Sequence, residues 1–192
     1  SGVLESVTLP PGFPRSYFIP FVALSMPMDG EWTSKRKYLG SPIQADLEEE
    51  TGFTAGFRLG REFSWGLLEF ELKGFRNSYR RTDVHVYLPP LQGSASGASM
   101  LGNVGGRLAL SERSSLFAGF GLGMAYVDSS LDSPYPDESD VAFAYQAFIG
   151  FEHAFSQSME TFLRYKFFGT ADLDHFSGRR LHELEAGLGF LF

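Results

Sequence analysis

Apolar and polar residues alternate along most of this chain, with the period of two that places neighbouring side chains on opposite faces of a β-strand. From Leu116 to Tyr126, apolar residues occupy every second position, and glycine fills three of the positions between them. The segment 65–75 (WGLLEFELKGF) alternates leucine and phenylalanine with glutamate and lysine. This pattern predicts strands with two unlike faces rather than helices.

Eight segments have this alternation or a continuous apolar run, and each is about ten residues long, which is the length of a tilted strand that crosses a bilayer. The segments are 16–26, 51–63, 65–75, 100–110, 116–126, 143–153, 159–168 and 184–192. No run of 18 apolar residues, the signal of a transmembrane helix, occurs in the chain. We therefore predict an all-β fold that crosses a membrane.

The connections between these segments alternate in length. Short turns are expected at REFSW, LSERSS and AFSQSM, and long links at about 27–49, 77–98, 128–140 and 169–181. Outer-membrane barrels have short turns on the periplasmic side and longer loops outside the cell. We therefore predict an eight-stranded antiparallel transmembrane barrel with four longer extracellular loops.

The two strand faces differ in bulk as well as in polarity. Eight strands enclose only enough space for side chains to fill, and the phenylalanine-rich face would overfill it. The sequence therefore predicts that this face contacts lipid and that the face with glycines and charges lines the lumen. The predicted interior network is Arg58, Glu69, Glu71, Lys73, Arg107, Glu152, Arg164, Lys166, Glu183 and Glu185, with Glu62 and Glu160 close by. Because buried charges must be paired, we expect a plugged lumen.

The segment LEAGLGFLF closes the chain with two spaced phenylalanines. Its residues Glu185, Gly187, Phe190 and Phe192 resemble the C-terminal assembly signal of outer-membrane proteins. Together with LFAGFGLGMAYV and VAFAYQAFIGFEHAFSQSMETFLRYKFF, it makes the chain similar to the small eight-stranded outer-membrane barrels, namely OmpA-like membrane domains and opacity-type surface proteins. The resemblance implies a protein of the Gram-negative outer membrane that the barrel assembly machinery inserts.

The resemblance covers the barrel but not the loops. We expect residues 1–15, which contain three prolines, to form an extended segment and residues 16–192 to form the barrel. A signal peptide is expected to have been removed already, since the N-terminus lacks a basic region followed by an apolar one.

The composition limits the kinds of partner and cofactor that the protein can bind. The net charge of −7 argues against a nucleic-acid-binding protein, because such binding depends on cationic contacts to phosphates. The chain has no cysteine, so disulfides and thiolate metal sites are excluded. We expect no cofactor and no metal site. The acidic segment 128–140 offers hard oxygen ligands for a cation, but it does not have the spacing of an EF-hand loop, and a solvated acidic loop is the favoured interpretation.

Catalysis on lipid would require a histidine beside a serine and an acid on the lipid face. His153 and His182 have outward parity, but Ser156 lies three residues from His153 and is expected to point the other way. We therefore predict no enzyme and keep a lipid A-modifying enzyme as the less favoured alternative.

Two basic clusters lie in the long links: Lys35, Arg36 and Lys37, and then Arg80 and Arg81. Outside the cell they would lie near lipopolysaccharide phosphates, which arginine and lysine bind well, although ordinary loop charge explains them equally. The sequence predicts a membrane anchor whose loops contact lipopolysaccharide, a host surface ligand or a larger membrane complex. A narrow solute pore is the main alternative.

Overall fold

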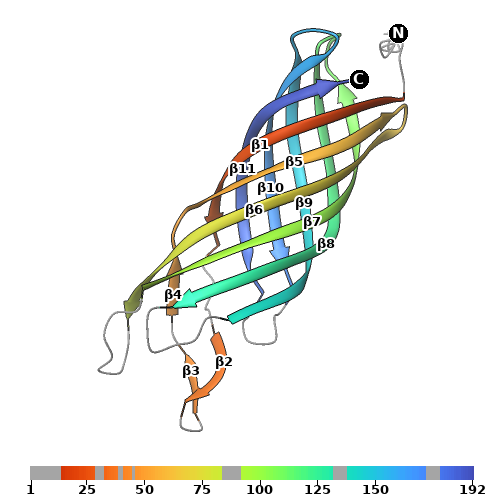
Figure 1. Cartoon of the computed structure of the whole chain (residues 1–192). Coiled ribbons are helices and arrows are strands. Elements are labelled where there is room, and N and C mark those ends of the chain that lie inside the picture. Colours follow the sequence, from red (N-terminus) through yellow and green to blue (C-terminus); the bar gives the residue numbers. More distant parts are fainter. Residues whose placement is uncertain are drawn as a thin grey trace, which may run out of the picture.

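The computed structural model describes residues 14–28, 33–38, 41–44, 46–83, 92–131, 138–171 and 178–192. These residues form strands and turns, and none of them belongs to a helix that could cross a membrane. Eight strands make the barrel (Figure 1): β1 (Arg15–Pro27), β5 (Gly52–Phe63), β6 (Gly66–Asp83), β7 (Gln92–Ala109), β8 (Ser114–Leu131), β9 (Glu138–Ala154), β10 (Met159–Thr170) and β11 (Arg180–Leu191).

The barrel is closed by its first and last strands. Every strand pairs antiparallel with its neighbours in the chain, β6 pairs with β7, and β1 pairs with both β5 and β11. Near the closure, the amide of Ser16 donates to the carbonyl of Phe192 at 3.0 Å, and the amide of Phe192 donates back at 2.9 Å. A closed barrel leaves no unpaired edge, which is the condition for a sheet in lipid.

The inside-out arrangement predicted from the sequence is confirmed. Phe120 and Ile149 on the outer face are 56 % and 55 % exposed, whereas Arg58 and Glu71 are completely buried. A soluble barrel would place these residues the other way round. The exposed apolar belt and the charged interior together make this a membrane-spanning barrel of the outer-membrane type.

Four of the strands are much longer than the sequence predicts. Strands β6, β7 and β8 have 18 residues and β9 has 17, whereas the other four have 12 or 13. The expected links 77–98 and 128–140 are therefore mostly strand, with Asn77 paired to Ala95 and Val127 paired to Asp140. Polar residues break the apolar alternation there, but the ladder of backbone hydrogen bonds continues beyond the apolar belt.

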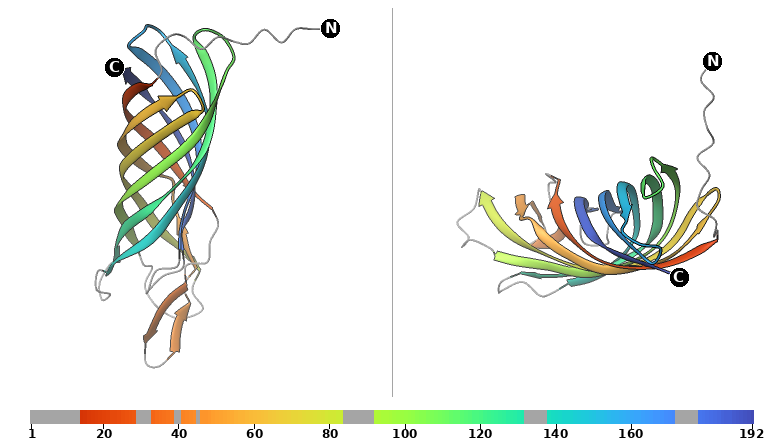
Figure 2. Two further views of the ribbon diagram at one scale, coloured as in Figure 1. Left: turned by 90° about the vertical axis from the view of Figure 1, so that its right-hand side faces the viewer. Right: turned by 90° about the horizontal axis from the view of Figure 1, so that it is seen from above.

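The expected link 27–49 also contains strands. Strands β2 (Thr33–Tyr38) and β3 (Ser41–Gln44) form a hairpin, and β4 (Asp46–Glu49) pairs with the far end of β6. Figure 2 shows this hairpin, in orange, beyond the end of the barrel that is opposite the C-terminus. The expected extended segment 1–15 lies almost wholly outside the described residues, which begin at Pro14.

Candidate functional site

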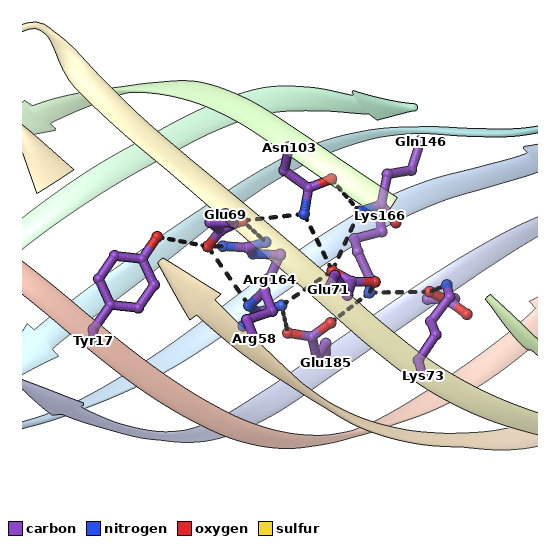
Figure 3. A network of polar contacts seen from close by, with 11 residues as sticks. Tyr17, Arg58, Glu69, Glu71, Lys73, Asn103, Gln146, Arg164, Lys166 and Glu185 are labelled. Atoms are coloured by element: carbon purple, nitrogen blue, oxygen red, sulfur yellow. Dashed lines mark hydrogen bonds and ion pairs between the residues drawn. The ribbon is translucent and has the colours of Figure 1, made fainter. Parts of the chain in front are cut away.

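The middle of the lumen is filled by four cations and four carboxylates, which we call the central cluster (Figure 3). The cluster consists of Arg58, Lys73, Arg164 and Lys166 with Glu69, Glu71, Glu183 and Glu185, and all eight are buried. Its formal charge is therefore zero. Charges can persist in a low-dielectric interior only when they are paired in this way.

The strand period gathers these residues on one face. Glu69, Glu71 and Lys73 are alternate residues of β6, and they point inward together. The register then sets cations against carboxylates on neighbouring strands: Arg58 pairs with Glu71, Arg164 with Glu185, and Lys166 with Glu183. Opposite charges across two strands stabilise a sheet.

The side chains of the central cluster form a continuous network. The Nζ of Lys166 lies 2.6 Å from Glu185, 3.1 Å from Glu71 and 3.3 Å from Glu183. Lys73 donates to Glu183 at 2.7 Å. The guanidinium of Arg164 holds Glu69 with two hydrogen bonds of 2.8 and 3.0 Å, and Arg58 contacts Glu185. The two parallel hydrogen bonds from Arg164 fix the orientation of the Glu69 carboxylate and also balance its charge.

Neutral side chains complete the network. Gln146 donates to Asn103 at 2.8 Å and to Glu71 at 3.2 Å, and the hydroxyl of Tyr17 donates to Glu69 at 3.0 Å. The network predicted from the sequence did not include Asn103, Gln146 or Tyr17. Their partners depend on how β1, β7 and β9 close around the lumen.

Phenylalanines with inward parity cover the cations. The guanidinium of Arg164 lies 4.6 Å from the ring centre of Phe117 and 4.3 Å from that of Phe148. Arg58 is flanked at 4.8 and 4.7 Å by Phe21 and Phe162. Cation–π contacts of this kind are strongest where water is excluded. They pack the lumen around the charges.

A second group, the rim cluster, lies nearer the short turns. It consists of Arg15, Glu62, Arg107, Glu152 and Glu160. Arg107 contacts Glu152 and donates to Glu62 at 2.8 Å, while Arg15 lies 2.7 Å from Glu62 and 3.9 Å from Glu160. Three carboxylates therefore share two guanidinium groups. The predicted network contained Arg107 and Glu152 but not Arg15.

The space between the two clusters is small. The cavity there measures about 10 Å³ and is lined by members of both clusters together with Tyr17, Phe117 and Phe162. This is barely enough for a single water molecule. Side chains therefore fill this part of the lumen.

The structure brings together a serine and a histidine that sequence analysis did not pair. Ser114 and His153 are cross-strand neighbours, and the serine Oγ lies 2.9 Å from the histidine Nδ1. Within the described ranges, no carboxylate is hydrogen-bonded to His153. This pair could not be recognised from the sequence, because it depends on the register between β8 and β9. In the sequence, the serine nearer to His153 is Ser156.

The remaining histidines do not form a catalytic group either in the part of the chain that is described. His182 stacks on Tyr165 with ring centres 5.7 Å apart, and the tyrosine hydroxyl contacts its Nδ1. His85 and His175 lie outside the described residues. No three His, Asp or Glu side chains of the described residues are grouped as metal ligands; of the acidic segment, 132–137 lies outside this description.

The other predicted site residues are located as follows. Lys35, Arg36 and Lys37 belong to β2, and Arg80 and Arg81 belong to β6, but their side chains lie outside the described part of the structure. In the proposed assembly signal, Phe190 and Phe192 point outward and Glu185 points into the central cluster. Gly187 leaves room for the inward ring of Phe162, which lies where a Cβ atom would project.

Comparison with known proteins relates the fold to solved structures. No protein-family model matches the chain, and no curated protein sequence matches it. The outer membrane protein OprG from Pseudomonas aeruginosa superposes with a TM-score of 0.71 at 10 % identity, over 93 % of this chain and 96 % of OprG. Neisserial surface protein A superposes with a TM-score of 0.60 at 14 % identity, over 91 % of this chain and 96 % of that protein. The chain therefore has the fold of small eight-stranded outer-membrane barrels.

Proposed function

We propose that this protein is a non-enzymatic integral protein of the Gram-negative outer membrane whose filled barrel anchors a partner-binding surface outside the cell. The observation that carries the proposal is the extension of β6–β9. A bilayer-crossing strand requires about 9 to 11 residues, yet these four strands have 17 or 18. They build a paired wall that continues on the side of the long connections (Figure 1).

The filled lumen supports an anchor rather than a pore. A solute path would have to pass both the central cluster and the phenylalanines that cover it. The central cluster is neutral and fully buried, and the cavity beside it measures about 10 Å³, which supports a lumen without a water-filled route. A narrow solute pore remains the alternative that conductance measurements address.

A lipid A-modifying enzyme is the less favoured alternative. The Ser114–His153 pair lies at the end of the barrel that has the short turns, which is the periplasmic end in this orientation. Lipopolysaccharide occupies the opposite leaflet. This pair also has no carboxylate in the described structure to orient the histidine, as the triad mechanism requires.

Different partners are proposed for the two ends of the barrel. Outside the cell, Lys35, Arg36, Lys37, Arg80 and Arg81 are proposed to contact lipopolysaccharide phosphates, a host surface ligand or a larger membrane complex. On the periplasmic side, Glu185, Gly187, Phe190 and Phe192 are proposed to be recognised by the barrel assembly machinery.

The proposal is tested by two measurements on the purified full chain. Planar-bilayer recordings are expected to show no steady conductance; discrete, reproducible channels would overturn the anchor in favour of a pore. Binding of purified lipopolysaccharide is expected to weaken in a variant with Lys35, Arg36, Lys37, Arg80 and Arg81 changed to glutamine. The matched control is Arg113→Gln in a short turn. Equal binding by both variants would remove lipopolysaccharide as the partner of these residues.

A further inference from the structure

The outer wall of the barrel has a hollow near the end that carries the short turns. We propose that this hollow is a binding trough for one glycerophospholipid of the periplasmic leaflet, with the anionic headgroup held by Arg61. The proposal rests on the orientation in the proposed function, in which the short turns face the periplasm.

The trough is shallow and open to the outside, with a volume of about 700 Å³, and it crosses strands β1, β5, β6, β7 and β8. Its floor is the row Tyr17, Gly60, Glu69 and Asn103, in which each residue pairs with the next across adjacent strands. The side chains of Tyr17, Glu69 and Asn103 point into the lumen. The membrane therefore meets the backbone along this row.

The walls of the trough are the two neighbouring rows of outward side chains. Leu59, Phe70 and Leu122 form one wall, and Leu68, Val104 and Phe120 form the other. The first wall is lowest at Gly102, which lies between Phe70 and Leu122 and has no side chain. The space there is open, since a Cβ atom on Gly102 would meet only the carbonyl oxygen of Leu122, at 4.0 Å. An extended acyl chain suits this apolar channel.

A cation stands at the interfacial end of the trough. Arg61 lines it there together with Ser16 and Phe192, and its guanidinium lies 5.7 Å from the ring centre of Phe63. No carboxylate among the described residues is ion-paired with Arg61, whereas Arg15, Arg58, Arg107 and Arg164 are all paired with glutamates. A guanidinium at this position is well suited to a lipid phosphate, which it can hold with two parallel hydrogen bonds.

The depth of Arg61 matches the position of a headgroup. It lies just before the turn at Ser64 and Trp65, and Phe63 and Trp65 stack with ring centres 5.3 Å apart. Paired aromatics of this kind mark the membrane–water interface in barrels. The phosphate of a lipid in this leaflet is therefore level with the guanidinium.

The direction of the trough matches the rest of the lipid. The row of floor residues begins near the periplasmic start of β1 and reaches Gly121 well inside β8. It therefore rises from the interface into the apolar belt, as an acyl chain below its headgroup does. A second copy docked on the trough about a two-fold axis would bring in a second Arg61, and among the described residues neither arginine would have a carboxylate partner. The charge therefore favours an anionic lipid.

The experiment is native mass spectrometry of the detergent-purified full chain titrated with phosphatidylglycerol. Gly102→Leu fills the trough from the outer face, where the structure leaves room for a side chain. Its matched control is Gly106→Leu on the same strand, where a Cβ atom has no neighbour within 4 Å and which does not line the trough. Arg61→Gln removes the cation, and Arg113→Gln is the control in a nearby turn.

We expect the wild-type chain to retain one phosphatidylglycerol, and Gly102→Leu and Arg61→Gln to bind it about tenfold more weakly, which corresponds to about 1.4 kcal/mol. Both controls are expected to bind as the wild type does. A heat-modifiable shift on denaturing gels verifies that each variant has folded.

Three outcomes would overturn the trough. The first is equal binding by both test variants and their controls. The second is retention of diacylglycerol as strongly as phosphatidylglycerol, because the arginine would then contribute nothing. The third is a dimer that Gly102→Leu dissociates, since the occupant would be a second copy. Conductance would contradict the proposed anchor, and unchanged lipopolysaccharide binding would remove lipopolysaccharide as the partner of the basic residues. Neither result would change the outcome of the phosphatidylglycerol titration.

Discussion

The two faces of β6 are built from consecutive residues and have opposite environments. Glu69, Glu71 and Lys73 on the inner face are at most 5 % exposed, whereas Leu68, Phe70 and Leu72, which alternate with them, are 38–45 % exposed. The inner face is stabilised by specific ion pairs, so each residue depends on its partners. The outer face needs only to be apolar. The difference predicts that substitutions inside act through charge balance and that those outside act through depth in the bilayer.

The largest loss of folding stability is expected from Glu71→Gln in the central cluster. This change keeps the volume of the side chain but leaves Lys166 and Arg58 with one carboxylate fewer in a fully buried site. Breaking a buried ion pair from one side costs about 3–5 kcal/mol. Denaturant unfolding in phospholipid vesicles would measure this loss. A loss of only a few tenths of a kcal/mol would mean that water reaches the cluster, contrary to the filled lumen.

The next largest loss of stability is expected from a charge placed on the outer face. Ile149→Arg places a charge in the middle of the apolar belt and is expected to destabilise the barrel by about 2–4 kcal/mol. Its control, Leu108→Arg, lies near the end of β7 and should cost about 0–1 kcal/mol. The same unfolding measurement compares the two variants. Equal costs would show that residues 108 and 149 do not differ in depth.

The sequence predicted most of the fold because the period of two is local and needs no partner. The inside-out assignment was also within reach, since Phe120 and Ile149 are too bulky for the lumen of eight strands. The length of β7 was not predictable in this way, because its serine- and glycine-rich start has no apolar alternation. Its pairing there depends on β6 and β8.

The candidate site was predictable as a set of residues but not as a set of contacts. The alternation placed both Glu71 and Lys166 on the inner face. Their 3.1 Å contact, however, joins two residues that are 95 positions apart in the sequence, on β6 and β10. Such partners follow from barrel closure and shear, which a single strand pattern does not contain. The same reason explains why Arg15 and the Ser114–His153 pair emerged from the structure alone.

The smallest effect is expected from Glu160→Gln in the rim cluster, which is chemically the same change as Glu71→Gln. Glu160 is the third carboxylate beside two arginines, and one of its side-chain oxygens has no hydrogen-bond partner among the described residues. Its closest cation, Arg15, is 3.9 Å away and already pairs with Glu62. Removing the surplus negative charge should therefore leave the free energy of unfolding within about 0.5 kcal/mol of wild type, or raise it slightly. If this variant lost as much stability as Glu71→Gln, burial alone would set the cost, and the distinction between balanced and unbalanced clusters would not hold.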